Sequence, residues 1–167
     1  MTIDELNNLP LNRLEEELTK CCGSSNWISH LIASKPFLSK EDLFLKAEKT
    51  WKQTNENDWL EAFSHHPKIG DLESLEKKFA STKVMAGSEQ SSVQSASHKT
   101  LVELADGNLK YENKFGFIFI VFATGKSADE MLSLLNARIK NDRETELKNA
   151  ATEQYKILQL RLQKLIS

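Results

Sequence analysis

The chain has few of the residues that interrupt helices. Only three of its 167 residues are proline and six are glycine, and the glycines are dispersed along the sequence. Since proline and glycine are the poorest helix formers, helices can extend over most of the chain. The dispersed glycines also exclude a glycine-rich loop that wraps a phosphate group.

Cysteine is nearly absent. The two cysteines, Cys21 and Cys22, are adjacent and poorly placed to bond to each other. The sequence therefore predicts no disulfide framework, which fits a reducing compartment. No group of cysteines and histidines has zinc-ligand spacing, so we expect no metal site. A chain of 167 residues can bury a sizeable core without such cross-links.

Long apolar runs and an excess of positive charge are missing as well. The longest strongly apolar run, Phe115 to Ala123, is too short to cross a bilayer, and neither end of the chain resembles a secretory or peroxisomal signal. The net charge of −2 argues against nucleic acid as a partner. We therefore expect a cytoplasmic globular protein that binds neither membranes nor nucleic acid.

Helix-start signals recur along the sequence. A serine, threonine or asparagine stands three residues before an acidic residue in Thr2–Glu5, Ser39–Asp42, Ser127–Glu130 and Asn141–Glu144. Apolar residues recur with helical spacing between these signals. The sequence predicts an all-α fold: a single-domain helical bundle over residues 1–167, with about eight to ten helices and one buried extended segment.

Three boundaries follow from local composition. Gly23 should end a helix that begins near Leu11, because glycine commonly follows the last residue of a helix. Residues 81–87 have the composition of a loop. A serine-rich helix should then run from about Ser88 to Leu104, or as far as Tyr111.

The buried extended segment is predicted over residues 115–122, which are aromatic, β-branched or glycine and have the composition of a strand. A single strand has nothing to pair with here. We therefore expect the segment to cross a helical core, where its backbone N–H groups need partners outside a sheet. A bound ligand is one candidate, and side chains or water are the alternative.

Two histidines stand directly before a proline. Pro67 disfavours the helical conformation at His66, so the preceding helix should end near Phe63 and leave both imidazoles at its C-terminal end. The helix dipole favours a protonated imidazole there. A titratable ring on a rigid turn suits proton transfer near neutral pH. The alternative is that His65 or His66 only caps the helix.

Two other polar groups could bind a ligand. Glu89 and Gln90 stand near the start of the serine-rich helix, where free N–H groups favour an anion. The alternative is that Ser88 or Glu89 simply caps this helix. Arg138 precedes a helix break and could hold a carboxylate through paired hydrogen bonds. Its alternative is a solvated run of charges, which we accept for the charged residues that follow it.

Taken in order, these features resemble the OHCU decarboxylases, which are the 2-oxo-4-hydroxy-4-carboxy-5-ureidoimidazoline decarboxylases of urate degradation. The resemblance runs over nearly the whole chain. It rests on Cys21 to Trp27, His66-Pro67-Lys68-Ile69-Gly70, Glu89-Gln90, Tyr111 to Phe119, and Arg138 with Asn141 to Glu146. No single motif decides, but the five in this order are specific.

Two positions depart from the family pattern. Ala86 stands where the family often has a serine, three residues before the glutamate, so Ser88 or Ser91 would have to supply that hydroxyl. Ile118 replaces a frequent proline and adds a backbone N–H to the extended segment.

The resemblance implies a decarboxylation of a small-molecule substrate to (S)-allantoin, with no organic cofactor and no metal. It implies that His66 lies beside the reacting carbon and handles a proton, and that Glu89 orients His66 or carries a proton itself. His65 is the competitor for the catalytic position. The resemblance also implies a homodimer, with the last two helices as the contact.

The same resemblance implies the groups that bind the substrate. Gln90 and Arg138 would hold ureido and carboxylate oxygens. Backbone N–H groups near Phe117 and Phe119 or Ile120 would bind oxygens of the ring. Two other functions stay open: a helical interaction module without catalysis, and a related enzyme that acts on another ureido or imidazoline acid.

Overall fold

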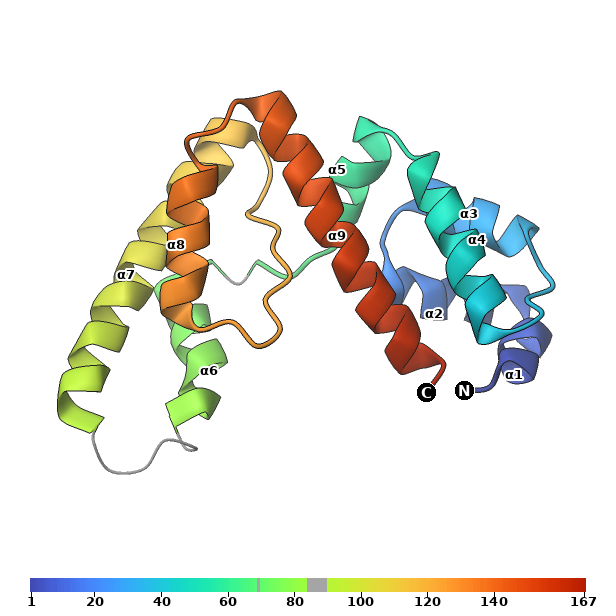
Figure 1. Cartoon of the computed structure of the whole chain (residues 1–167), viewed down its shortest axis with the longest axis horizontal. Helices are drawn as coiled ribbons and strands as arrows, with labels where there is room; N and C mark the ends of the chain where they lie inside the picture. Colours follow the sequence, from blue (N-terminus) through green and yellow to red (C-terminus); the bar gives the residue numbers. More distant parts are fainter. Residues whose placement is uncertain (69, 84–89) are drawn as a thin grey trace. The chain divides into compact units, whose positions relative to one another are not determined.

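The computed structural model describes residues 1–68, 70–83 and 90–167, with side chains for 1–68, 70–80 and 98–167. In these ranges all regular secondary structure is α-helical (Figure 1). The nine helices in these ranges are α1 (Ile3–Asn8), α2 (Leu11–Cys21), α3 (Ser25–Ala33), α4 (Lys40–Lys52), α5 (Glu56–Ser64), α6 (Leu72–Lys83), α7 (Gln90–Phe115), α8 (Ala128–Arg138) and α9 (Arg143–Leu165). The prediction of an all-α fold with eight to ten helices is confirmed.

The chain divides into two compact units. The first comprises Met1–His66 and Asn149–Ser167, and the second comprises Pro67–Lys148. Helix α9 thus has its first residues in the second unit and the remainder in the first.

The first unit is built around α3, which packs against α2, α4 and α5. Trp27 of α3 has no exposed surface, and its indole Nε1–H donates to the backbone oxygen of Ala47 in α4 over 3.2 Å. The apolar stripes of the neighbouring elements complete the core with Leu6, Leu14, Leu18, Leu31, Phe37, Leu43, Phe63, Leu158 and Leu162.

The second unit is built around α7, which packs along α8 and against α6; Figure 1 shows α7 and α8 side by side. Its buried apolar cluster comprises Leu75, Phe79, Leu101, Leu104, Met131 and Leu135. Phe119, Val121 and Ala123, in the connection between α7 and α8 that contains the predicted extended segment, pack against this cluster.

Residues 116–123 form neither helix nor strand, as predicted. Gly116 has a φ of 82° and its N–H donates to the backbone oxygen of Glu112 over 2.8 Å, which ends α7 in the left-handed conformation that glycine adopts most easily. Phe115 is therefore the last helical residue and not part of the extended segment. Phe117 and Ile120 are buried, and the residues between them are half-buried.

Three of the four predicted helix starts are confirmed. The Thr2 and Glu5 pair forms a reciprocal capping box, and the side chains of Ser39 and Ser127 accept from backbone N–H groups three residues later. The fourth is wrong by one residue, because α9 begins at Arg143 and the Asp142 carboxylate accepts from the N–H of Thr145 over 2.8 Å.

Other predicted boundaries need correction. Helix α2 ends at Cys21 with an extended Cys22 as its cap, so Gly23 does not end the helix through a left-handed turn. Helix α6 continues to Lys83, and helix α7 continues past Tyr111 to Phe115. The predicted start at Ser88 and the remainder of the predicted loop, 84–87, lie outside the described residues. No helix within the described ranges has the length and apolar character needed to cross a bilayer.

Candidate active site

The turn that carries the two histidines follows α5 as predicted. The helix ends at Ser64, and His65 is its C-cap. The N–H of His66 donates to the backbone oxygen of Phe63 over 3.1 Å. Pro67 has no N–H with which to continue the helix, so the chain turns away at this point.

His66 is half-buried and forms a hydrogen bond with a residue on α9. Its ring nitrogen Nε2 lies 2.5 Å from Oε1 of Gln154, whose side chain has no exposed surface. Both residues belong to the first unit. The contact joins two positions that are 88 residues apart in the sequence.

Burial lowers the pKa of His66 below its usual range. The hydrogen bond to Gln154 opposes this shift, and the positive charge of Arg161 on α9 and the neighbouring His65 add to it. The position at a helix end predicts a protonated ring; the pKa is lowered instead, because loss of hydration disfavours the charged form. A neutral imidazole at neutral pH can accept a proton from a substrate.

His65 has a different environment. It is exposed, and it packs so closely on Gly23 that a methyl group added to this glycine would overlap Cβ and Cγ of the histidine. Gly23 is thus required for close approach and not for backbone conformation. This packing gives His65 a structural role in the first unit.

A second polar group, in the second unit, is centred on Glu146. This side chain has no exposed surface. One of its oxygens accepts from the hydroxyl of Tyr111 over 2.6 Å and from Nε of Arg138 over 2.5 Å, and the other accepts from Nδ2 of Asn141 over 3.0 Å. The buried carboxylate therefore has a cation and two neutral donors, which is how a buried charge is tolerated.

Arg138 also contacts the extended segment. Its Nη1 donates to the backbone oxygen of Ile120 over 2.7 Å, and its guanidinium lies 4.7 Å from the centre of the Phe119 ring. Tyr111 stacks edge-on against the same ring and against Phe117. The two edges of the guanidinium that would grip a carboxylate are thus engaged with Glu146 and Ile120. Its role as a substrate clamp stays a prediction.

The backbone of the extended segment has free donors. The N–H groups of Ile118, Phe119 and Ile120 donate to no other group in the part of the chain that the structure describes. Backbone N–H groups without partners, beside a guanidinium, are available to donate to an anionic or carbonyl oxygen of a ligand. Their predicted role as ligand donors is compatible with this arrangement and stays a prediction.

The remaining predicted positions have little or no structural description. Glu89, with Ala86 and Ser88 of the same motif, lies outside the described residues. Gln90 is the first residue of α7, and its side chain is not among those described.

Sequence reasoning assigned no role to Gln154 and Glu146, although each has a visible signal. Gln154 lies on the apolar stripe of α9, four residues after Ala150 and four before Leu158. A polar residue on a buried helical face needs a hydrogen-bond partner. Glu146 lies four residues before the buried Ala150 on the same helix and has the same signal.

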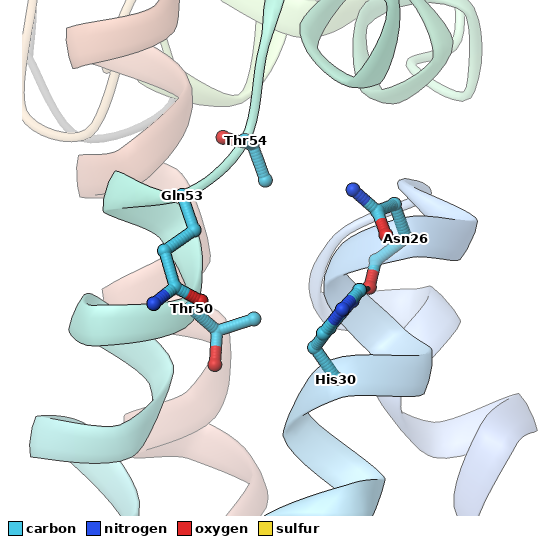
Figure 2. A pocket seen from close by; sticks show the side chains of 5 residues that line it. All are labelled: Asn26, His30, Thr50, Gln53 and Thr54. Atoms are coloured by element: carbon cyan, nitrogen blue, oxygen red, sulfur yellow. Dashed lines mark hydrogen bonds between the residues drawn. The ribbon is translucent and has the colours of Figure 1, made fainter.

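A separate cavity of about 160 Å³ lies in the first unit. Figure 2 shows Asn26 and His30 of α3 on one side of it, and Thr50 of α4 with Gln53, the C-cap of that helix, on the other. The Nδ1 atom of His30 is bonded to the backbone oxygen of Asn26, and the Thr50 hydroxyl donates to the backbone oxygen of Lys46. None of the predicted site residues lines this cavity. In the described ranges, no three His, Cys, Asp or Glu side chains meet as metal ligands do.

Comparison with known proteins gives consistent matches. A family model described as OHCU decarboxylase matches residues 7–163. The chain is 43% identical, over 92% of its length, to a uric acid degradation bifunctional protein TTL of Arabidopsis thaliana, and spans 47% of that relative. It is 24% identical to a 2-oxo-4-hydroxy-4-carboxy-5-ureidoimidazoline decarboxylase of Haloferax volcanii, covering 97% of this chain and 94% of the relative. The chain thus spans about half of the bifunctional relative and nearly all of the shorter one.

The fold matches as well. A crystal structure of OHCU decarboxylase in the presence of (S)-allantoin superimposes with a TM-score of 0.72 and 39% identity, covering 90% of this chain and 97% of that chain. The resemblance that the motifs indicated is confirmed along almost the full sequence, and this chain belongs to the OHCU decarboxylase family.

Proposed function

We propose that this chain decarboxylates 2-oxo-4-hydroxy-4-carboxy-5-ureidoimidazoline in urate degradation and forms (S)-allantoin. The observation that carries the proposal is the 39% identity, over nine-tenths of the chain, to an OHCU decarboxylase crystallised in the presence of (S)-allantoin. The half-buried His66, whose pKa is lowered by burial, supplies the acid–base group that the reaction needs.

The chemistry can proceed without an added electron sink. The carboxylate and hydroxyl are on one ring carbon, and the ureido group is on its neighbour, which has a double bond to nitrogen. When CO₂ leaves, the electron pair of the broken bond forms a double bond to that neighbour, and the ring nitrogen takes up the displaced pair and a proton. Loss of the hydroxyl proton and addition of a proton to the neighbouring carbon give the carbonyl form. We therefore propose no organic cofactor and no metal.

The protein has to orient the carboxylate and deliver the proton to one face of the ring. We propose that His66 takes the hydroxyl proton, since a neutral imidazole is a base matched to neutral pH. Glu89 orients His66 or carries the proton to carbon. His65 is the weaker candidate, because it is exposed and packed on Gly23.

We propose that the remaining predicted residues bind the substrate. The free N–H groups from Ile118 to Ile120 bind ring oxygens, together with the backbone at Phe117. Gln90 binds the ureido group. Arg138 contributes a positive charge beside Phe119 and one Nη1 hydrogen that Ile120 does not use.

The test is to generate the unstable substrate in situ from urate with urate oxidase and hydroxyisourate hydrolase, and to follow circular dichroism. A rapid rise of optically active allantoin supports the proposal. Racemic product at the uncatalysed rate contradicts it, and is the result that both an interaction module and an enzyme for another ureido acid predict.

We further propose that the protein works in the cytoplasm as a homodimer, with α8 and α9 at the contact. The two thiols, Cys21 and Cys22, are buried and free, which is compatible with a reducing compartment. Burial raises the pKa of the Cys21 thiol to about 11, so it is not a reactive thiolate. Size-exclusion chromatography with light scattering measures the molar mass in solution and so distinguishes a dimer from a monomer.

A further inference from the structure

The contact between Gln154 and His66 constrains which imidazole nitrogen carries hydrogen. Nε2 of His66 lies 2.5 Å from Oε1 of Gln154. An amide oxygen can only accept, so Nε2 must be the donor. In the neutral ring, a hydrogen on Nε2 leaves the lone pair on Nδ1. Nδ1 has no hydrogen-bond partner within the described ranges.

The burial of the Gln154 side chain costs stability, which points to a function for its contact with His66. Its side chain has no exposed surface, and its amide nitrogen has no partner among the described residues. An unpaired buried donor costs about 1–3 kcal/mol. Ala150, Ala151 and Leu158 are buried on the same helix, so an apolar residue would fit the stripe without that cost.

We propose that Gln154 is a positioning residue that holds His66 in the Nε2–H tautomer, so that Nδ1 is the atom that exchanges a proton with the substrate. The tautomer is a property of the free protein. Only the role of Nδ1 in the reaction rests on the proposed function.

The groups around His66 give the contact a direction that can be measured. Loss of hydration, the charge of Arg161 on α9 and the neighbouring His65 all oppose protonation of the ring. The bond to Gln154 is the one contribution that favours it. Removing the acceptor should therefore lower the pKa of His66, and a carboxylate in its place should raise it.

The experiment is a long-range proton–nitrogen NMR spectrum of ¹⁵N-labelled protein, recorded across pH. The chain has four histidines, and His66→Asn assigns the resonances of interest. In the wild type we expect the Nε2–H pattern for His66. In Gln154→Leu we expect both tautomers and a lower pKa, and in Gln154→Glu a pKa higher by about one unit.

Matched controls are available on the same helix. Gln163 is exposed, and Gln163→Leu and Gln163→Glu should leave the tautomer, the pKa and turnover of the wild type. Gln154→Met, which preserves the length of the side chain, is a second variant without the amide oxygen; its thioether accepts only weakly, so it is expected to fold and to behave as Gln154→Leu does.

Kinetics give the functional readout. We expect Gln154→Leu to lower kcat about 10- to 100-fold, the range typical of residues that orient a functional histidine, with little change in KM. The acidic limb of the pH–rate profile should move with the pKa found by NMR. An Nδ1–H tautomer in the wild type, or an unchanged tautomer and pKa in both Gln154→Leu and Gln154→Met, would overturn the inference. A wild type that forms no (S)-allantoin contradicts the proposed function instead, and the spectrum still decides the tautomer.

Discussion

Arg138 directs both Nε and Nη2 at a single carboxylate oxygen of Glu146, each over 2.5 Å, and the Glu146 side chain has no exposed surface. Because Nη1 of the same guanidinium donates to Ile120, the pair ties the first turns of α9 to the extended segment. The N–H groups that we propose as ligand donors lie in that segment. The ion pair therefore supports the candidate site as well as the fold of the second unit.

Breaking this pair should affect stability and turnover together. Arg138→Ala leaves a buried carboxylate without its cation, and we expect a loss of about 3–5 kcal/mol in the free energy of unfolding. Arg138→Lys keeps the charge but cannot reach Glu146 and Ile120 at once, so a smaller loss and slower turnover are expected. Urea unfolding and the allantoin assay measure both effects. Arg13→Lys, in an exposed pair with Glu16, is the control. Full activity in Arg138→Lys would contradict both proposed roles of Arg138: support of the extended segment through Glu146 and Ile120, and binding of the substrate carboxylate.

Replacing His66 should remove activity and leave the fold intact. His66→Ala is expected to lower kcat by at least about 100-fold, the usual contribution of a general acid or base. The substitution leaves Oε1 of the buried Gln154 without its donor, so we expect a folded protein whose free energy of unfolding is lower by about 1–3 kcal/mol. His98→Ala, an exposed position, is the control. An active His66→Ala with an inactive His65→Ala would show that the other histidine is catalytic.

His66 should also contribute to the pH dependence of stability. Its pKa is lower in the folded protein, so the unfolded chain binds the proton more readily. The corresponding stability is present above the ordinary histidine pKa of about 6.5 and is lost as pH falls through the folded-state value. Chemical denaturation of wild type and His66→Ala between about pH 5 and pH 8 tests this. An equal slope in both proteins would contradict it.

The close packing of His65 on Gly23 allows a paired test. In Gly23→Ala the new methyl group overlaps the histidine side chain, so we expect a loss of about 1–3 kcal/mol in stability. His65→Ala in the same protein should restore most of it. Gly70→Ala is the control, because its added methyl group would lie 3.4 Å from Asn108, an ordinary contact. Additive effects of the two substitutions would contradict the proposed overlap.

Much of the fold follows from local patterns in the sequence. The caps at Thr2, Ser39 and Ser127, the helix stop before Pro67 and the extended segment after Gly116 each depend on a few neighbouring residues. Such features are set by backbone sterics and by hydrogen bonds within one turn, so spacing and residue type predict them.

The features that sequence reasoning missed depend on contacts between distant positions. Asn141 has the spacing of a cap, but its amide bonds to the buried Glu146, and Asp142 caps α9 instead. The lowered pKa of His66 comes from burial and from Arg161, which is 95 residues further along (161 − 66). The dipole of α5 is a property of the local element alone, so neighbouring residues in the sequence reveal only that contribution. A polar residue on an apolar helical stripe, such as Gln154, is the sequence feature that indicates such a buried contact.

The buried Tyr111 should make the stability of the protein depend on pH in the alkaline range. Burial, and then its hydrogen bond to Glu146, raise the pKa of this tyrosine far above its ordinary value. The folded protein therefore keeps a proton that the unfolded chain releases above about pH 10, and stability should fall with rising pH by up to about 1.4 kcal/mol per pH unit. Tyr111→Phe should remove that part of the slope. At neutral pH it should cost about 1–3 kcal/mol, because the buried Glu146 loses a donor.

The matched control for this prediction is the other tyrosine of the chain, Tyr155, which is only half-buried. Tyr155→Phe should cost less at neutral pH, because its hydroxyl bonds to Gln159 at a partly exposed site. Ultraviolet absorbance of the phenolate, recorded during the alkaline titration, reports ionisation directly. In Tyr155→Phe, where Tyr111 is the one tyrosine left, phenolate absorbance should rise only together with loss of helical circular dichroism. Phenolate formation at the ordinary tyrosine pKa with the helices intact would show that the Tyr111 hydroxyl is not held by Glu146 in a buried site.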